Sequence, residues 1–280
     1  MSLQNNNEKE FESHLISEYL KYGSIEQVFS VHKYSLPISF ATYHRLLNKY
    51  KIIKSAGPNS KLSESLNFLG QLANYKLPLE RAYHKYAPSS VQISTNTLHR
   101  ILHYTRLKIT RRTGAALLVS RESDKNKYLI ANDLSLHNPE LGKSGDYSLP
   151  MTHSRENESI SDSITRVMQQ EMFTKETTMG LFPKELVPDD INPIMYINIA
   201  DIKVSVYRLV IPDSFENFTS HKLTNFQFAT NKEIQKLNLR PGVGDIVKKY
   251  EEIRFNPQNS EIIDFDSSLN AKLYAWCSKI

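Results

Sequence analysis

A loop and the amphipathic segment after it carry carboxylates in a pattern suited to phosphate chemistry. From Leu149 the chain reads LPMTHSRENESISDSITRVMQQEMF, with Glu158 in the expected loop and with Arg166 and Glu171 in the expected helix. Carboxylates that converge on one side of a helix can hold divalent metal ions, which neutralise a diphosphate and activate water. The segment therefore predicts either a metal-dependent site for phosphate cleavage or the remnant of one.

The spacing of these residues resembles the sequence box of the Nudix family, Gx5Ex7REUxEExGU, in which U is an aliphatic residue. With the arginine of the box on Arg166, its first glutamate falls on Glu158 and its last on Glu171 without any gap. The flanks agree, because a Leu-Pro lead-in and two expected strands precede the box and FATNKEI resembles a segment that follows it. The resemblance covers residues 112–252, and it implies an α+β domain, an α/β/α sandwich, over residues 113–280.

Both glycines and two of the glutamates of the box are replaced in this sequence. Val167 and Gln170 replace two metal-binding glutamates, and Thr152 and Phe173 replace the two glycines. Valine offers no ligand atom, and an amide oxygen is a much weaker partner for a hard dication than a carboxylate. The resemblance therefore implies a catalytically inactive domain that holds no cofactor, or at most one weakly bound Mg²⁺ or Mn²⁺ ion.

Positive charge is concentrated in the first part of the chain. Residues 1–114 contain 16 Lys and Arg against seven Glu and no Asp, whereas residues 115–280 contain 19 Lys and Arg against 23 acidic residues. The two parts therefore carry net charges of +9 and −4 within the +5 of the whole chain. A basic part joined to an acidic part is typical of a nucleic-acid-binding module fused to a second domain. A solvated basic face is the alternative, which charge alone does not distinguish.

The basic part contains a duplicated segment. ISFATYHRLL from Ile38 and ISTNTLHRIL from Ile93 agree at six positions with a constant offset of 55. Helical periodicity predicts three short helices in the first copy, as in a helix-turn-helix unit, and the duplication extends this prediction to the second copy. We therefore expect a multidomain chain with an all-α tandem helix-turn-helix part, whose units span residues 1–57 and 58–112.

The third helix of each unit carries the residues expected to contact DNA. In a helix-turn-helix this helix enters the major groove by its N-terminal end, so early polar side chains reach base edges while later Lys and Arg neutralise phosphates. The expected base contacts are Ser39, Thr42, Tyr43, Arg45, Ser94, Asn96, Thr97 and Arg100. The expected phosphate contacts are Lys49, Lys51, Lys54, Lys108, Arg111 and Arg112. These units resemble tandem modules of bacterial regulators and the paired modules of transposases; an ordinary helical bundle or a partner-docking surface is the alternative.

The second part of the chain reads as a mixture of strands and helices. GAALLVSRE and KYLIAND, joined by the polar SDKNK, are expected to form a hairpin, and IMYINIADIKVSVYRLVIP is rich in strand-forming residues. FQFATNKEIQKL reads as a strand that enters a helix. The C-terminal SLNAKLYAWCSKI predicts a helix that packs on this domain or on a second subunit through Leu269, Leu273, Trp276, Cys277 and Ile280.

The combined pattern favours a DNA-binding transcriptional regulator in which an inactive Nudix-like domain senses a ligand or mediates dimerisation. The resemblance to Nudix-related regulators implies double-stranded DNA and a nucleotide-type effector as partners, and we expect a homodimer. A divergent metal-dependent hydrolase of nucleoside diphosphate derivatives is one alternative, and a recombination or replication accessory protein is the second. No apolar run is long enough to cross a bilayer, and the polar N-terminus and single Cys277 indicate a cytoplasmic setting.

Overall fold

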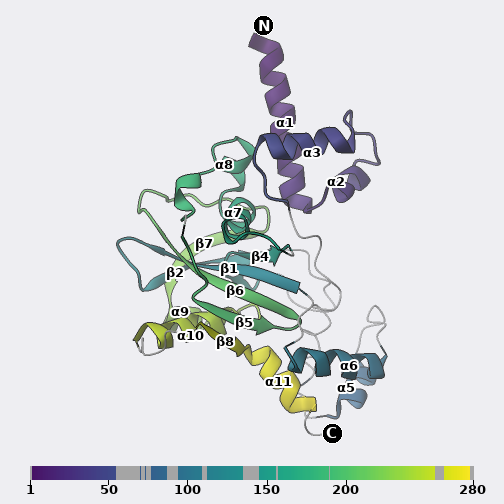
Figure 1. Ribbon diagram of the computed structural model, residues 1–280, viewed down its shortest axis with the longest axis vertical. Coiled ribbons are helices and arrows are strands. Elements are labelled where there is room, and N and C mark those ends of the chain that lie inside the picture. The colour runs from purple at the N-terminus through teal and green to yellow at the C-terminus, as the bar shows by residue number, and fades with distance from the viewer. Residues whose placement is uncertain are drawn as a thin grey trace.

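Helices gather at both ends of a central group of strands (Figure 1). The computed structural model describes residues 2–54, 70, 73, 77–86, 94–108, 112–134, 145–155, 157–188, 190–255 and 262–277. One helical unit lies at the N-terminal end of the long axis, and a second lies at the opposite end beside the C-terminal helix (Figure 1). Within these ranges, no helix is both long and apolar enough to cross a bilayer.

The first helical unit consists of three helices: α1 (Ser2–Tyr22), α2 (Ile25–Val31) and α3 (Phe40–Lys49). Gly23, with a φ of 77°, follows α1 in the left-handed conformation that glycine adopts without steric cost. Ser24 and Ser39 then cap α2 and α3, because each side-chain oxygen accepts a hydrogen bond from a backbone N–H three residues later. The three helices predicted in this region are present. Their shared apolar core includes Leu15, Ile16, Tyr19, Leu20, Val28, Phe29, Tyr43, Leu46 and Leu47.

The second helical unit is described over α5 (Leu79–Tyr86) and α6 (Thr95–Arg106). The buried Leu98 and Leu102 of α6 belong to the same apolar cluster as Leu273 of the C-terminal helix α11 (Ser268–Cys277). The predicted C-terminal helix therefore packs on α6 as well as on the strands, a contact that the sequence did not indicate. The predicted unit boundary at residue 57 and the side chains of Trp276, Cys277 and Ile280 lie outside the described residues.

The strands form two sheets. A mixed sheet has the order β4–β1–β6–β5–β8, and an antiparallel sheet has the order β3–β2–β7. In the larger sheet β1 and β6 run parallel, with Arg112 opposite Ile202 and Arg121 opposite Ile211. The strand bounds are β1 (Arg112–Arg121), β2 (Lys127–Asp133), β3 (Tyr147–Ser148), β4 (Met151–Ser154), β5 (Met195–Ile199), β6 (Ile202–Ile211), β7 (Leu223–Thr230) and β8 (Ile263–Asp266).

The predicted hairpin between GAALLVSRE and KYLIAND is wrong, although both segments are strands. β1 pairs with β4 and β6, whereas β2 pairs with β3 and β7. β1 is buried along most of its length, as expected for a central strand whose two edges are both occupied. The polar turn therefore passes the chain from one sheet to the other. The later strand-rich segment does form an antiparallel pair, β5 with β6.

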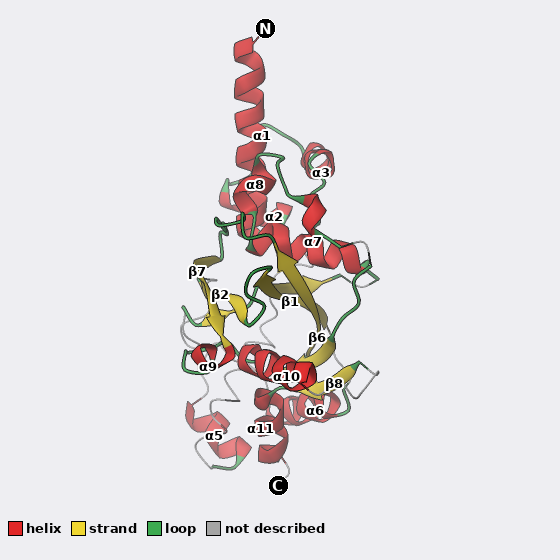
Figure 2. Ribbon diagram, turned by 90° about the vertical axis from the view of Figure 1, so that its left-hand side faces the viewer, coloured by secondary structure: helices red, strands yellow, loops and turns green. Residues whose placement is uncertain are grey.

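Helices cover both faces of the strands, which is the layered arrangement expected of an α/β/α sandwich (Figure 2). On one side α7 (Ile160–Glu171) contributes Ile164, Val167 and Met168 to an apolar cluster. On the other side α10 (Val243–Phe255) contributes Ile246 and Val247 to the second cluster. Three short helices complete the domain: α8 (Thr174–Thr178), η2 (Lys184–Leu186) and α9 (Asn231–Ile234). β7 leads into α9 through a capping box, which confirms the predicted strand that enters a helix.

Candidate functional site

The box helix α7 turns its arginine inward. Arg166 is fully buried and pairs with the carboxylate of Glu158, which also accepts a hydrogen bond from the Ser163 hydroxyl at 2.8 Å. Ser159 caps the helix immediately after Glu158, so the loop that carries this carboxylate is fixed to the first helical turn. The structure therefore brings these two box residues together as an internal ion pair.

The two positions where a carboxylate is missing lie in different surroundings. Val167 is fully buried in the apolar cluster between α7 and the strands. Gln170 is also buried, and the Thr152 hydroxyl donates to its amide oxygen at 3.5 Å. The Gln170 amide nitrogen has no hydrogen-bond partner among the described residues. Position 167 therefore contributes packing, and position 170 contributes a neutral amide.

The last carboxylate of the box, Glu171, lies beside a lysine. The Lys222 ammonium is 3.4 Å from a carboxylate oxygen of Glu171. Burial raises the pKa of Glu171, and the positive charge of Lys222 opposes this rise. Lys222 lies in the segment that leads into β7, and no motif in the sequence indicated it. A protein cation thus stands next to a carboxylate that the family resemblance assigns to a metal ion.

A divalent metal ion does not fit this set of donors. Mg²⁺ and Mn²⁺ are bound by several oxygen ligands, and carboxylates are the strongest of these in proteins. Glu158 is engaged by Arg166, and Glu171 is engaged by Lys222. Across the part of the chain that the structure describes, no group of three or more His, Cys, Asp or Glu side chains is placed to hold a metal ion. In the described part of the box, the two remaining carboxylates are thus each paired with a cation of the protein.

His153 lies on β4 in positively charged surroundings. Burial, together with the nearby charges of Arg112, Lys222 and Arg166, lowers the pKa of His153 to about 4, and Asp201 acts in the opposite direction. The buried Nε2 atom of His153 has no hydrogen-bond partner among the residues that are described. The imidazole is therefore neutral at physiological pH.

The third helices, α3 and α6, begin with the same local structure. The Ser39 hydroxyl accepts a hydrogen bond from the backbone N–H of Thr42 at 3.1 Å and lies 2.9 Å from the Thr42 hydroxyl. Ser94 and Thr97 repeat this arrangement at 3.2 and 2.9 Å. The duplication in the sequence is therefore a duplication of a capped helix start. Ser39 is therefore hydrogen-bonded to Thr42, and Ser94 to Thr97, so these four predicted base contacts are already paired within their own helices.

The other predicted base contacts differ in exposure. Arg45 on α3, and Asn96 and Arg100 on α6, are exposed to solvent. Tyr43 is fully buried instead, and its hydroxyl donates to the carbonyl oxygen of Leu15 at 2.5 Å. The prediction that Tyr43 contacts bases is therefore wrong, because the helical period turns this residue toward the core of its unit.

The predicted phosphate contacts differ in their surroundings. Lys49 pairs with Glu12 at 2.7 Å, and Lys108 pairs with Asp264 at 3.2 Å. Arg112 is half-buried at the start of β1. Arg111 lies outside the described residues, and Lys51 and Lys54 lie where the first helical unit meets α7.

A glutamine of the box joins the first helical unit to the domain that contains the strands, which we call the sheet domain (residues 112–277). The Gln169 amide donates to the carbonyl oxygen of Lys51 at 3.0 Å and accepts from the backbone N–H of Ile53 at 2.9 Å. A second contact joins Ser17 of α1 and His221, whose side chains are 3.1 Å apart. No motif in the sequence indicated Gln169, because this residue occupies an unspecified position of the box and its partners are more than 100 residues away.

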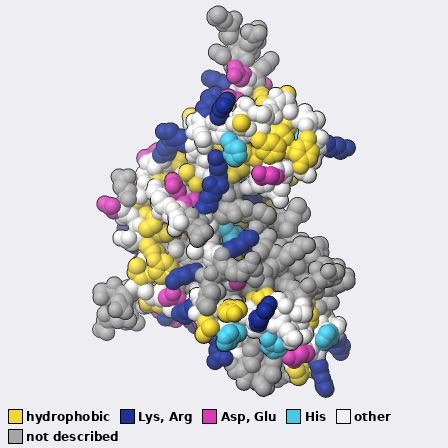
Figure 3. Space-filling model, turned by 45° about the vertical axis from the view of Figure 1, so that its right-hand side comes forward, with side chains coloured by type: hydrophobic (Ala, Val, Ile, Leu, Met, Phe, Trp, Pro, Cys, Tyr) yellow, Lys and Arg dark blue, Asp and Glu magenta, His cyan; other side chains and the backbone are white. Residues whose placement is uncertain are grey.

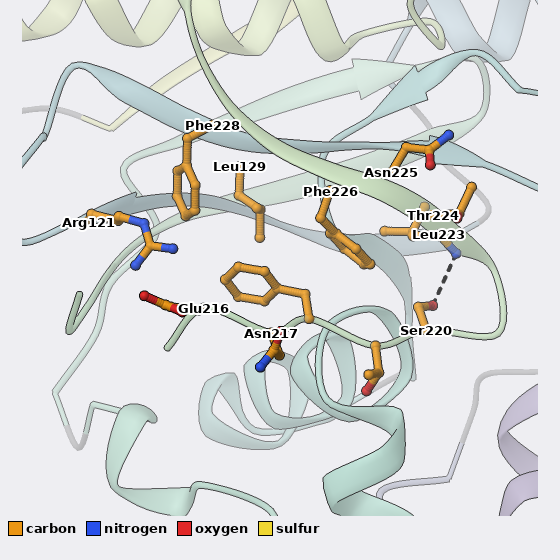
Figure 4. A pocket seen from close by; sticks show the side chains of 12 residues that line it. Arg121, Leu129, Glu216, Asn217, Ser220, Leu223, Thr224, Asn225, Phe226 and Phe228 are labelled. Carbon is orange, nitrogen blue, oxygen red and sulfur yellow. Dashed lines mark hydrogen bonds between the residues drawn. The ribbon is translucent and has the colours of Figure 1, made fainter. Parts of the chain in front are cut away.

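A separate cavity of about 510 Å³ lies against β7 (Figure 4). Phe226 and Phe228 of β7 line it together with Phe218, whose ring is 5.5 Å and 6.0 Å from theirs between centroids. At one end the Arg121 guanidinium lies 4.7 Å from the centroid of the Phe228 ring. Aromatic surfaces with a cation at their edge suit a planar heteroaromatic ligand. No pattern in the sequence pointed to this cavity.

No family model matches the sequence, and no curated protein matches it. Solved structures resemble the chain at low identity. The NUDIX domain of NrtR from Shewanella oneidensis, complexed with ADP ribose, is 12% identical over 63% of this chain and 99% of that chain, with a TM-score of 0.38. A MutT protein from Methanosarcina mazei is 15% identical over 51% and 94%, with a TM-score of 0.37. A NUDIX hydrolase from Nitrosomonas europaea is 13% identical over 55% and 78%, with a TM-score of 0.38.

Proposed function

We propose that this protein is a DNA-binding transcriptional regulator whose Nudix-like domain has no metal-dependent activity. One observation carries the proposal. α3 and α6 repeat the same serine-capped start, and each exposes an arginine at its sixth position, Arg45 and Arg100. A short helix that presents an exposed arginine near its N-terminal end suits recognition in the major groove, where arginine can donate two hydrogen bonds to guanine.

The surroundings of the two helices support this assignment. Tyr43 and Leu47 fix the inner face of α3 in the core, which leaves Arg45 on the outer face. Lys, Arg and His side chains are visible at both ends of the molecule, where the two helical units lie (Figure 3). We assign base contacts to Arg45, Asn96 and Arg100, and phosphate contacts to the basic residues around them.

In this proposal the Nudix-like domain senses a ligand or mediates dimerisation. The cavity lined by Phe218, Phe226 and Phe228 is the candidate site for a nucleotide-type effector, because a base can stack on its rings near Arg121. An effector changes DNA affinity only if it binds two conformations of the protein unequally. A homodimer would present its third helices to two half-sites of one operator.

The test begins with the selection of bound duplexes from a random pool, followed by fluorescence anisotropy over a range of salt concentrations. Arg45→Ala and Arg100→Ala are each expected to lower affinity for a selected duplex by about 5- to 150-fold, because a bidentate arginine contributes about 1–3 kcal/mol of base discrimination. Affinity for a random duplex should change much less. Arg254→Ala, on α10, serves as the matched control.

Two results would contradict the proposal. The first is the absence of duplex binding at low salt, where phosphate contacts contribute most. The second is turnover of nucleoside diphosphate derivatives with Mg²⁺ or Mn²⁺, because this would favour the divergent hydrolase.

A further inference from the structure

A cavity of about 280 Å³ lies at the junction between the first helical unit and the sheet domain. It has room for several water molecules or for a phosphate group. Both units line it, with Lys49, Tyr50 and Lys51 from the helical unit and Gln169, Gly180 and Lys184 from the sheet domain.

Two lysines from different units meet at this cavity. Lys51 and Lys184 both line it, and the proximity of Lys51 lowers the pKa of Lys184. The third lysine, Lys49, is already paired with Glu12. Of the described residues that line the cavity, none is Asp or Glu. Two like charges without a carboxylate between them create a positive potential that a bound anion would neutralise.

The backbone around these lysines is held in place. The Gln169 amide donates to the carbonyl oxygen of Lys51 and so fixes this residue against α7. Gly180 has a φ of 75°, and a Cβ atom at this position would lie 3.4 Å from the Tyr50 ring. A glycine therefore allows the turn after α8 to approach the helical unit closely. The cavity is preorganised, which reduces the entropy cost of ligand binding.

We propose that this junction cavity binds a phosphate-bearing anion, which Lys51 of the helical unit and Lys184 of the sheet domain hold together. Each ammonium group can donate charge-assisted hydrogen bonds to phosphate oxygens. Because one lysine belongs to each unit, the anion bridges the first helical unit and the sheet domain. The residues that line the site do not include Arg45 or Arg100, so the proposal stands even if the chain does not bind DNA.

Isothermal titration calorimetry on the full chain at low ionic strength tests the site, with inorganic phosphate and pyrophosphate as probes. The double variant Lys51→Gln/Lys184→Gln is expected to weaken binding of the probes at least tenfold. Lys248→Gln, an exposed lysine on α10, should bind them as the wild type does. The proposal is overturned if the wild type binds neither probe, or if the double variant binds both with unchanged affinity.

A random-sequence duplex distinguishes the two sources of phosphate. If phosphate competes with the duplex and the double variant binds both more weakly, the site takes a backbone phosphate of DNA. If the double variant loses phosphate binding but keeps its duplex affinity, the site takes a free anion. Both outcomes support the anion site. If the chain binds phosphate but no duplex, only the DNA-binding function is contradicted, and the anion site is still supported.

A charge reversal gives a second, independent test. Lys184→Glu places a carboxylate beside Lys51, where the anion is proposed to bind. The variant should have a higher Tm than the wild type at low salt without phosphate, and phosphate should no longer raise its Tm. Lys248→Glu is the control for the change in net charge. A phosphate response in Lys184→Glu equal to that of the wild type would overturn the proposal.

Discussion

The box helix α7 and the third helices α3 and α6 are amphipathic, but they place their charged side chains on opposite sides. On α7, Arg166 and Glu171 are buried, and each lies beside a residue of opposite charge. On α3 and α6, Arg45 and Arg100 are exposed, and no described residue forms an ion pair with either. A charge that is paired inside the protein specifies its packing, whereas an exposed charge remains available to a partner.

This difference explains why a box in correct register need not be an active site. Glu158 joins the loop to the helix α7 through its ion pair with Arg166 and its hydrogen bond from Ser163. Lys222 brings a positive charge to within 3.4 Å of a carboxylate oxygen of Glu171. The spacing of the box residues thus indicates the local fold of the loop and helix. The residues around the box carboxylates determine which ligands these carboxylates can bind.

The largest expected effect is on stability, from the loss of a buried charge partner. Arg166→Ala leaves Glu158 buried without its cation, and we expect the free energy of unfolding to fall by about 3–5 kcal/mol. Arg45→Ala, on an exposed face, should change it by less than about 0.5 kcal/mol. Urea unfolding monitored by circular dichroism measures both. Equal effects of the two substitutions would remove the contrast between the helices.

The register of the box and the capped starts of the repeated helices could be predicted because both depend on residues close in sequence. Ser39 and Ser94 bond within one helical turn, and Glu158 and Arg166 are eight residues apart. Lys222 could not be predicted, because it lies 51 residues from Glu171 in the sequence and no local pattern pairs them.

The errors have a related cause. The position of Tyr43 in the first turns of the third helix predicts a base contact, but the helical period of its own unit turns it toward Leu15. β1 and β2 were assigned to one hairpin because they are neighbours in sequence. The parallel pairing of β1 with β6, which separates them, depends on residues about 90 positions away.

The second prediction concerns the pH dependence of stability and His153. Its folded-state pKa of about 4 lies below the ordinary value of 6.5, so the unfolded chain binds a proton that the folded chain rejects. The neutral His153 therefore contributes to the free energy of unfolding above pH 6.5, and this contribution is lost as the pH falls from 6.5 toward 4. The loss should reach on the order of 3 kcal/mol, because each pKa unit corresponds to about 1.4 kcal/mol. Tm measured between pH 7 and 4 checks this.

His153→Gln should lose less stability than the wild type over this pH range. His44→Gln, which alters an exposed histidine of α3, serves as its control. The prediction is wrong if the two variants show the same pH dependence.

The smallest expected effect is that of Glu171→Gln. Burial raises the folded-state pKa of Glu171 above 4.5, so the folded chain binds this proton more tightly than the unfolded chain and stability falls as the pH rises above 4.5. The neutral glutamine removes this loss, and the variant should have a higher Tm than the wild type at pH 7 but an equal Tm below about pH 4.5. Lys222 limits this rise in Tm because its positive charge already offsets part of the cost of burying the Glu171 carboxylate.

Mg²⁺ should raise the Tm of neither the wild type nor Glu171→Gln, since a ligand stabilises only the state that binds it. A rise in Tm with Mg²⁺ that Glu171→Gln abolishes would show that the box still holds a metal ion.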